Sequence, residues 1–191
     1  MNFVKKLSCK IGDDLVRSNV VNEEDEEIYI YGLNQILVSI ISVLSAMIIG
    51  VIGGMLFEIS VFMISYIPLR SFAGGYHAKT PTRCYLVSVI MLIAVLLSMK
   101  YLILPDWLYY TILLMAILVI FVFSPVEAMN KPLNKAEHKV YKRITICIAS
   151  AEVTVSLLLK LIMMNGLFIA IIYSFVMMSV MLVLGQVKNS F

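Results

Sequence analysis

Long stretches of this chain contain no charged residue, and their hydrophobic positions run on without polar alternation. Three such stretches are residues 28–57, 107–126 and 161–187. The first and the last exceed the roughly 20 residues that an α-helix needs to cross the hydrocarbon core of a membrane. Transmembrane β-strands would instead alternate apolar and polar residues in short segments. The pattern therefore predicts an all-α, polytopic membrane protein.

Turn-forming residues divide this apolar pattern into six expected transmembrane helices. The breaks contain Gly50, Gly53, Gly54, Pro105 and the Asn165-Gly166 pair. We expect the helices at residues 28–49, 55–69, 84–104, 107–123, 144–164 and 167–184. No repeat or soluble domain interrupts them, so residues 1–191 are expected to form one membrane domain, with the six-span bundle over 28–184. Gly50 or Gly54 could also serve a helix contact, which leaves a homodimer open.

Residues 1–21 precede the first span and are expected to form an interfacial amphipathic helix. Val4, Leu7, Ile11 and Leu15 recur at helical spacing, and lysines cover much of the remaining surface. This pattern suits a helix that lies on membrane lipids of an anionic leaflet. A solvated tail with chance periodicity is the alternative. Asn22 and the five acidic residues after it are typical of a helix start, so the first span should begin directly behind them.

The composition agrees with a membrane protein. Of 191 residues, 61% are hydrophobic and 14% are charged, and the mean hydropathy is +0.97. In soluble domains roughly 45–50% of the residues are hydrophobic and about 25% are charged. Three cysteines and two histidines are too few for a disulfide framework or a metal-rich protein, so we expect no metal and no cofactor. Nothing indicates nucleic-acid binding, because the basic residues are spread over loops beside lipid.

The Lys and Arg residues are distributed unevenly about the membrane. With six spans, 13 of the 15 fall on the side that holds both termini. Lys100 falls on the other side, and Lys160 is positioned to snorkel toward it. The positive-inside rule then predicts that both termini are cytoplasmic. We expect the membrane to be the cell membrane. The cysteines near that side are expected to be free thiols, because the cytoplasm is reducing.

The polar segment between the second and third spans, residues 70–84, holds the candidate chemistry. His77 and Cys84 are seven residues apart, which on an unbroken helix separates them by ~10.5 Å along the axis. Pro81 argues against an unbroken helix, because the residue before a proline avoids the α region. Thr80 as N-cap and Pro81 as the first helical residue would start the third span there. The chain could then fold His77 back onto Cys84.

Cys84 would lie in the first turn of that helix, close to cationic side chains. Gly74-Gly75 frees the backbone upstream, and the nearby cations are Arg70, Lys79 and Arg83. This environment favours a thiolate, and a thiolate paired with a histidine is the minimal equipment for cysteine nucleophilic catalysis. A lone cysteine or histidine at a membrane boundary is more often passive, so the interpretation depends on the combination.

Two further roles stay open at this level. Ser71 or a backbone carbonyl could orient His77. Backbone amides near Cys84 could stabilise an oxyanion.

The sequence Arg70…Gly74-Gly75-Tyr76-His77-Ala78…Cys84 closely resembles the signature of the accessory gene regulator B (AgrB) membrane endopeptidases. Chain length, six spans and a cytoplasmic position of this segment are similar too. The resemblance implies an enzyme of a Gram-positive-type bacterium that processes an AgrD-like precursor peptide into a cyclic autoinducing peptide for quorum sensing. It identifies His77 and Cys84 as the catalytic pair. Arg70 and Gly75 match positions of its motif, and we expect substitution there to harm activity.

The mechanism that the resemblance implies begins with attack of the Cys84 thiolate on a precursor carbonyl. The C-terminal tail of the precursor departs and a thioester remains on Cys84. A precursor Cys or Ser then closes a thiolactone or lactone ring, provided that water is kept out.

Two other classes remain as alternatives. A small six-helix transporter or exporter could use the intramembrane charges of Glu58, Glu152 and Lys160, because intramembrane charges are functional candidates by default. A structural membrane-assembly subunit is the other. A transporter would not need Cys84, and a structural subunit would tolerate changes at both His77 and Cys84. A zinc intramembrane protease would need a His-Glu-x-x-His helix, and a serine enzyme of the Gly-x-Ser-x-Gly type would need that elbow; the sequence contains neither motif.

Overall fold

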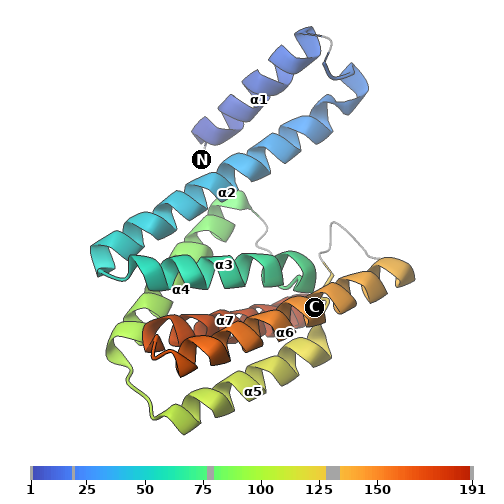
Figure 1. Ribbon diagram of the computed structural model, residues 1–191. Coiled ribbons are helices and arrows are strands. Elements are labelled where there is room, and N and C mark those ends of the chain that lie inside the picture. Colours follow the sequence, from blue (N-terminus) through green and yellow to red (C-terminus); the bar gives the residue numbers. More distant parts are fainter. Residues whose placement is uncertain (1, 19, 77–79, 128–133, 190–191) are drawn as a thin grey trace. The chain divides into compact units, whose positions relative to one another are not determined.

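The computed structural model describes residues 2–18, 20–76, 80–127 and 134–189 of the chain (Figure 1). The described residues form α-helices joined by short connections, with a 3-10 turn at Glu23–Asp25. In chain order the helices are α1 (Asn2–Arg17), α2 (Glu26–Gly53), α3 (Leu56–Ala73), α4 (Pro81–Tyr101), α5 (Asp106–Phe123), α6 (Lys135–Leu161) and α7 (Asn165–Asn189). The expectation of an all-α protein is confirmed.

Six of these helices, α2 to α7, are long and apolar enough to cross a membrane. Their apolar windows have mean hydropathies between 1.3 and 2.7. A helix satisfies its own backbone hydrogen bonds, which is why this element suits a solvent that offers none. The six-span prediction is confirmed, and α1 is the additional N-terminal helix that was expected before the first span.

The chain divides into two compact units, of which the first comprises residues 1–48 and 78–90. In this unit α1 packs on α2, and a side chain at Gly12 would collide with Ile30. Val4 and Ser8 are buried on the same face of α1, whereas Lys10 is exposed. The apolar face of α1 is thus at least partly covered by α2. Its location at the membrane surface stays a prediction.

The second unit comprises residues 49–77 and 91–191, and α7 is its central helix. Helices α3, α5 and α6 all pack against α7. In the apolar window of α7, 56% of the residues are buried, against 11–28% in the other five spans. Its core side chains are Phe168, Ile171, Ile172, Phe175, Met178 and Leu182. The outer faces of α3, α5 and α6 carry exposed large hydrophobic residues such as Phe57, Leu118 and Leu158, which suit contact with lipid.

The turn between α2 and α3 uses two of the glycines that the sequence analysis singled out. Gly54 has φ +70°. Its N–H donates to Val51 O (3.1 Å), and the N–H of Met55 donates to Gly50 O (2.9 Å). This pair of bonds is the Schellman arrangement that closes a helix. Gly50 is buried, and a Cβ there would lie 3.3 Å from Leu56 Cα, so this glycine serves a contact within the chain.

Several helix boundaries differ from the expectations, and two of them matter for the site and for the basic residues. Helix α3 continues past Leu69 to Ala73, because the left-handed φ of Gly74 ends it. Helix α6 begins at Lys135, nine residues before the expected start, because Asn134 and Glu137 form a capping box. The basic residues of this region that the structure describes therefore lie on a helix and not in a loop, and they are Lys135, Lys139, Lys142 and Arg143.

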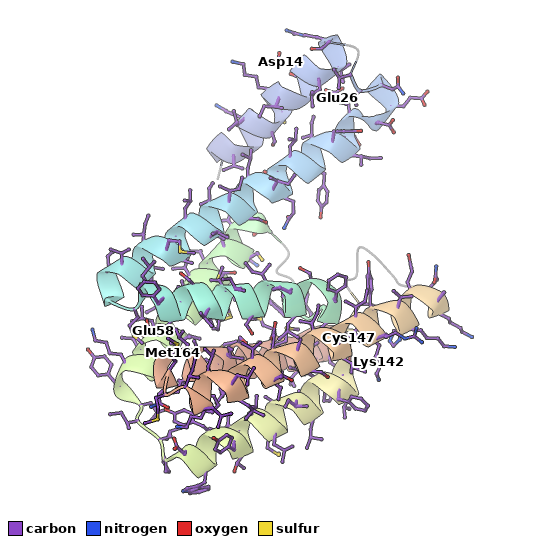
Figure 2. The ribbon with its side chains drawn as sticks, viewed as in Figure 1. Asp14, Glu26, Glu58, Lys142, Cys147 and Met164 are labelled. Carbon is purple, nitrogen blue, oxygen red and sulfur yellow. The ribbon has the colours of Figure 1, made fainter. Side chains whose placement is uncertain are left out.

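The turn between α6 and α7 also differs from the expected Asn165-Gly166 turn. Its left-handed residue is Met163, with φ +64°, and α7 already begins at Asn165. The N–H of Met164 donates to Leu159 O at 2.9 Å, which is again a Schellman bond. Figure 2 shows Met164 and Glu58 at this end of the unit and Lys142 toward the other end.

Candidate active site

The three residues that follow α3, Gly74, Gly75 and Tyr76, form a short non-helical segment that we call the strap. Gly74 has φ +74° and Gly75 has φ +115°. L-residues with a side chain rarely adopt such values, so the glycine pair is a backbone requirement. The strap ends directly before His77 in the sequence. Whatever fixes the strap therefore fixes the point from which the chain continues to His77.

Arg70 holds the strap from the last turn of α3. Its guanidinium donates one hydrogen bond to the carbonyl of Gly74 and a second to the carbonyl of Tyr76. The planar fork of an arginine can serve two acceptors at fixed geometry, which the single ammonium of a lysine does not reproduce. Arg70 is half-buried. The structure thus joins Arg70, Gly74 and Gly75, three of the predicted site residues, in one clamp.

Two more parts of the second unit contact the strap. The N–H of Tyr76 donates to the carbonyl of Met181 on α7, at 2.8 Å, and Lys188 Nζ lies 5.2 Å from the centre of the Tyr76 ring. On another side the N–H of Val126 donates to Ala73 O at 2.9 Å, and Gly74 pairs with Val126 in an isolated parallel bridge. These contacts could not be predicted from the sequence, because hydrophobic periodicity does not indicate which loop packs on which face of a helix.

Cys84 lies in the first unit, in the first turn of α4. The helix begins at Pro81 as predicted, and the N–H of Arg83 donates to the hydroxyl of Thr80 at 3.3 Å, as expected for an N-cap. The N–H of Cys84 donates to the carbonyl of Thr80 at 3.0 Å. The Cys84 side chain is half-buried and its thiol is free. Arg83 is exposed.

The next residue ties this turn to the preceding transmembrane helix of the same unit. The hydroxyl of Tyr85 lies 2.7 Å from the hydroxyl of Ser45 on α2. Because Tyr85 is adjacent to Cys84, this hydrogen bond sets the rotation of the first turn of α4 about its axis. That rotation determines the direction in which the thiol points.

The other residues expected to act in residues 70–84 are His77, Lys79, Ser71 and the backbone amides near Cys84. His77 and Lys79 lie outside the described residues, so the separation of His77 and Cys84 stays a prediction. Ser71 donates its hydroxyl proton to Ile67 O at 2.8 Å, within its own helix. The amides of Arg83 and Cys84 are both engaged in starting α4. These two amides are therefore already occupied and do not serve as oxyanion donors in this conformation.

Each charged residue that a transporter could use, Glu58, Glu152 or Lys160, lies against another residue of the second unit. Lys160 donates to Asp106 Oδ1 at 2.7 Å and to Asn165 Oδ1 at 3.0 Å. Glu152 is hydrogen-bonded to Ser65 at 2.7 Å. Glu58 lies beside Gly166, where a Cβ would be 3.0 Å from its carboxylate. These contacts join helices of the second unit, so the charges have packing roles that need no transport path.

In the part of the chain that the structure describes, no three His, Cys, Asp or Glu residues gather in a way that could hold a metal ion. The first unit supplies a free thiol at a helix start, with the exposed Arg83 next to it in the sequence. The second unit supplies a glycine strap that an arginine clamps.

Fold and site together define a polytopic α-helical membrane protein with a cysteine at the start of a transmembrane helix. The chain belongs to the accessory gene regulator B (AgrB) family, whose model matches residues 6–182. This family is known for peptide processing in agr quorum sensing. With six apolar helices and this membership, the chain is an integral membrane protein.

Curated relatives carry AgrB-like names. An AgrB-like protein of Clostridium perfringens strain SM101 is 27% identical over 145 residues, which cover 72% of this chain and 66% of the relative. One of Listeria monocytogenes strain HCC23 is 27% identical over 143 residues, which cover 72% of this chain and 70% of the relative. The match thus spans slightly less than two thirds of the Clostridium protein. No solved structure matches the chain.

Proposed function

We propose that this chain is a cysteine endopeptidase of the cell membrane that cleaves the C-terminal tail from a small AgrD-like precursor peptide and promotes its cyclisation to an autoinducing peptide. His77 and Cys84 are the catalytic pair. Arg70, Gly74, Gly75 and Pro81 position the pair, and Lys79 and Arg83 supply positive charge beside it. The autoinducing peptide serves quorum sensing in a Gram-positive-type bacterium.

The observation that carries the proposal is the Arg70 clamp. Its guanidinium binds the carbonyls of Gly74 and Tyr76, directly before His77 in the chain. A fixed arginine and two glycines with positive φ are the features that a segment needs if it must present the next side chain at a defined point. The family match over residues 6–182 and the start of α4 just ahead of Cys84 support the same assignment.

The first chemical step is acylation of the enzyme. His77 accepts the thiol proton, and Cys84 Sγ attacks the carbonyl carbon at the end of the future ring. The C–N bond of the scissile peptide then breaks. His77 returns the proton to the nitrogen of the leaving tail, which departs as a free amine. The products of this step are the tail and a thioester on Cys84.

The second step is ring closure. A cysteine thiol of the precursor, or a serine hydroxyl in some substrates, attacks the thioester carbonyl and gives its proton to His77. The bond between the carbonyl carbon and Cys84 Sγ breaks, and the Cys84 thiol regains that proton. No water is consumed. Exchange between thioesters is nearly isoenergetic, so the energy of the acyl-enzyme is kept only if water is excluded, which a site at the membrane boundary favours.

The test is precursor cleavage in cells that co-express the chain with an AgrD-like precursor, followed by mass spectrometry. Cys84→Ala should abolish both cleavage and the cyclic product, by at least about 10³-fold, as for other removed nucleophiles. It should retain precursor binding, because the thiol contributes little contact area. Cys9→Ala and Cys147→Ala, which change the two other free cysteines, should keep full activity. Cleavage by the Cys84→Ala protein would contradict the proposal.

A further inference from the structure

The face of α7 that meets the strap contains a glycine with no room for a side chain. Gly185 is buried. A Cβ built on it would lie 2.7 Å from both the carbonyl carbon of Gly75 and the backbone nitrogen of Tyr76. Real Cβ atoms essentially never approach another atom so closely. Because the obstructing atoms belong to the backbone, they cannot rotate away as a flexible side chain would.

Gly185 is part of a continuous seat for the strap. Met181, Gly185 and Lys188 are spaced by four and three residues, so they share one face of α7. Met181 offers its carbonyl to the Tyr76 N–H at 2.8 Å, and Lys188 Nζ lies 5.2 Å from the Tyr76 ring centre. Gly185 lies between them in the sequence and lets the two backbones touch.

The strap itself is held on both sides, so it cannot move away from a larger side chain on α7. Arg70 holds its carbonyls from the side of α3, and a Cβ at Gly75 would lie 2.9 Å from Met181 O. The backbones of the strap and of α7 are therefore in close contact, and this contact needs a glycine on each side, Gly75 on the strap and Gly185 on α7. A methyl group at Gly185 must displace either the strap or α7.

We propose that Gly185 is a positioning residue for His77. By seating Gly75 and Tyr76 against α7, it fixes the end of the strap from which the chain continues to His77. This inference rests on the proposed function, in which His77 takes the thiol proton of Cys84. It assigns a catalytic task to the last transmembrane helix, about 100 residues beyond the motif that carries the chemistry.

The test compares Gly185→Ala with Gly32→Ala in purified protein that lacks Cys9 and Cys147. Gly32 is a matched control, because it is also helical and a Cβ there meets nothing within 4 Å. A misplacement of about 1 Å costs on the order of a hundredfold in rate. We therefore expect Gly185→Ala to lower kcat for precursor cleavage by about tenfold to a hundredfold, with KM changed by less than about twofold. Gly32→Ala should match the parent.

A second measurement needs no precursor. Alkylation of Cys84 by iodoacetamide at neutral pH should be faster in the parent than in His77→Ala, because His77 promotes thiolate formation. The Gly185→Ala protein should react at nearly the rate of His77→Ala. If Gly185→Ala does not accumulate in membranes, Lys188→Gln is the second variant. It removes the cation beside the Tyr76 ring and should also lower the alkylation rate of Cys84.

The outcomes separate the two proposals. If the parent and His77→Ala are alkylated equally fast, the catalytic pair is wrong, and the role of Gly185 falls with it. If those two differ while Gly185→Ala keeps the kcat and the alkylation rate of the parent, the role of Gly185 alone is overturned. A loss in KM alone, with normal alkylation, would also overturn it, because it would indicate substrate contact and not positioning of His77.

Discussion

Glu152 shows how a single carboxyl is accommodated inside a transmembrane helix. Three contacts run in a row: Glu152 Oε2 to Ser65 Oγ at 2.7 Å, Ser65 Oγ to Ser174 Oγ at 2.6 Å, and Ser174 Oγ to the carbonyl of Ile171 at 2.7 Å. The Ser65 hydroxyl donates to the Glu152 carboxyl, and the Ser174 hydroxyl donates to the carbonyl of Ile171 in its own helix. The carboxyl of Glu152 thus accepts a hydrogen bond from a hydroxyl on α3, which itself lies against a hydroxyl on α7.

This hydrogen bond predicts the effect of two substitutions on stability. Glu152→Gln keeps an acceptor for the Ser65 hydroxyl and should change the free energy of unfolding by less than about 0.5 kcal/mol. Glu152→Ala removes the acceptor, and a hydrogen bond within a membrane is worth about 0.6 and at most about 1.7 kcal/mol. We expect a loss of about 1–2 kcal/mol with the lost packing included. Thermal unfolding in detergent measures both, and Glu24→Gln at an exposed position is the control. If Glu152→Gln destabilises the protein as much as Glu152→Ala does, an acceptor for Ser65 is not what Glu152 contributes to stability.

At the scale of elements, the start of α4 combines a cap, a proline and the candidate nucleophile within one turn. Thr80 accepts from the Arg83 N–H, Pro81 is the first helical residue, and Cys84 follows three positions later. Proline suits this position because its missing N–H would have no helical partner there. It also disfavours helical backbone at the preceding residue, so the helix cannot extend toward His77 without cost.

We therefore expect Pro81→Ala to slow acylation without impairing insertion into the membrane. Helix could then propagate backward through Thr80, which would move His77 toward the ~10.5 Å axial separation of residues seven apart. Single-turnover formation of the thioester measures the effect, and protein abundance in membranes reports insertion. Pro105→Ala, at the start of α5 in the second unit, should leave acylation unchanged. Acylation by Pro81→Ala at the parental rate would show that the proline does not bend the chain productively.

At the scale of the whole molecule, the distribution of basic residues predicts the orientation in the membrane. Thirteen of the 15 Lys and Arg residues fall on one side when the six helices are traversed in order. The later residues of this count do not change sides with the earlier start of α6, because Lys135, Lys139, Lys142 and Arg143 then occupy its N-terminal turns. Such an asymmetry orients a polytopic protein with its basic side in the cytoplasm.

A cysteine at Lys135 should therefore resist a membrane-impermeant maleimide in intact cells and react after the cells are opened. A cysteine at Lys100, which is exposed at the opposite end of α4 from Cys84, should react from outside. Both variants are made in a background without Cys9, Cys84 and Cys147, so that the introduced cysteine is the thiol that is labelled. Labelling of the Lys135→Cys protein in intact cells would reverse the orientation and place the candidate active site outside the reducing compartment.

The features that could be predicted from the sequence are those that local chemistry decides. Uninterrupted apolar runs determine six helices, because a chain in lipid must satisfy its own backbone. Thr80 and Pro81 determine where α4 begins, because capping and proline geometry act within one turn. Two boundaries were missed although their causes are local: Gly74 ends α3 after Ala73, and the capping box of Asn134 and Glu137 starts α6 at Lys135.

Only the tertiary structure decided which helix is central and what its faces touch. In a membrane helix the core-facing and lipid-facing sides are both apolar, so hydrophobicity alone does not distinguish α7, the most buried span, from α2. The contact of Glu152 with Ser65 and the seat of the strap at Gly185 both join residues that are distant in the chain. Such contacts depend on which surfaces meet, and the meeting of surfaces is set by packing in three dimensions.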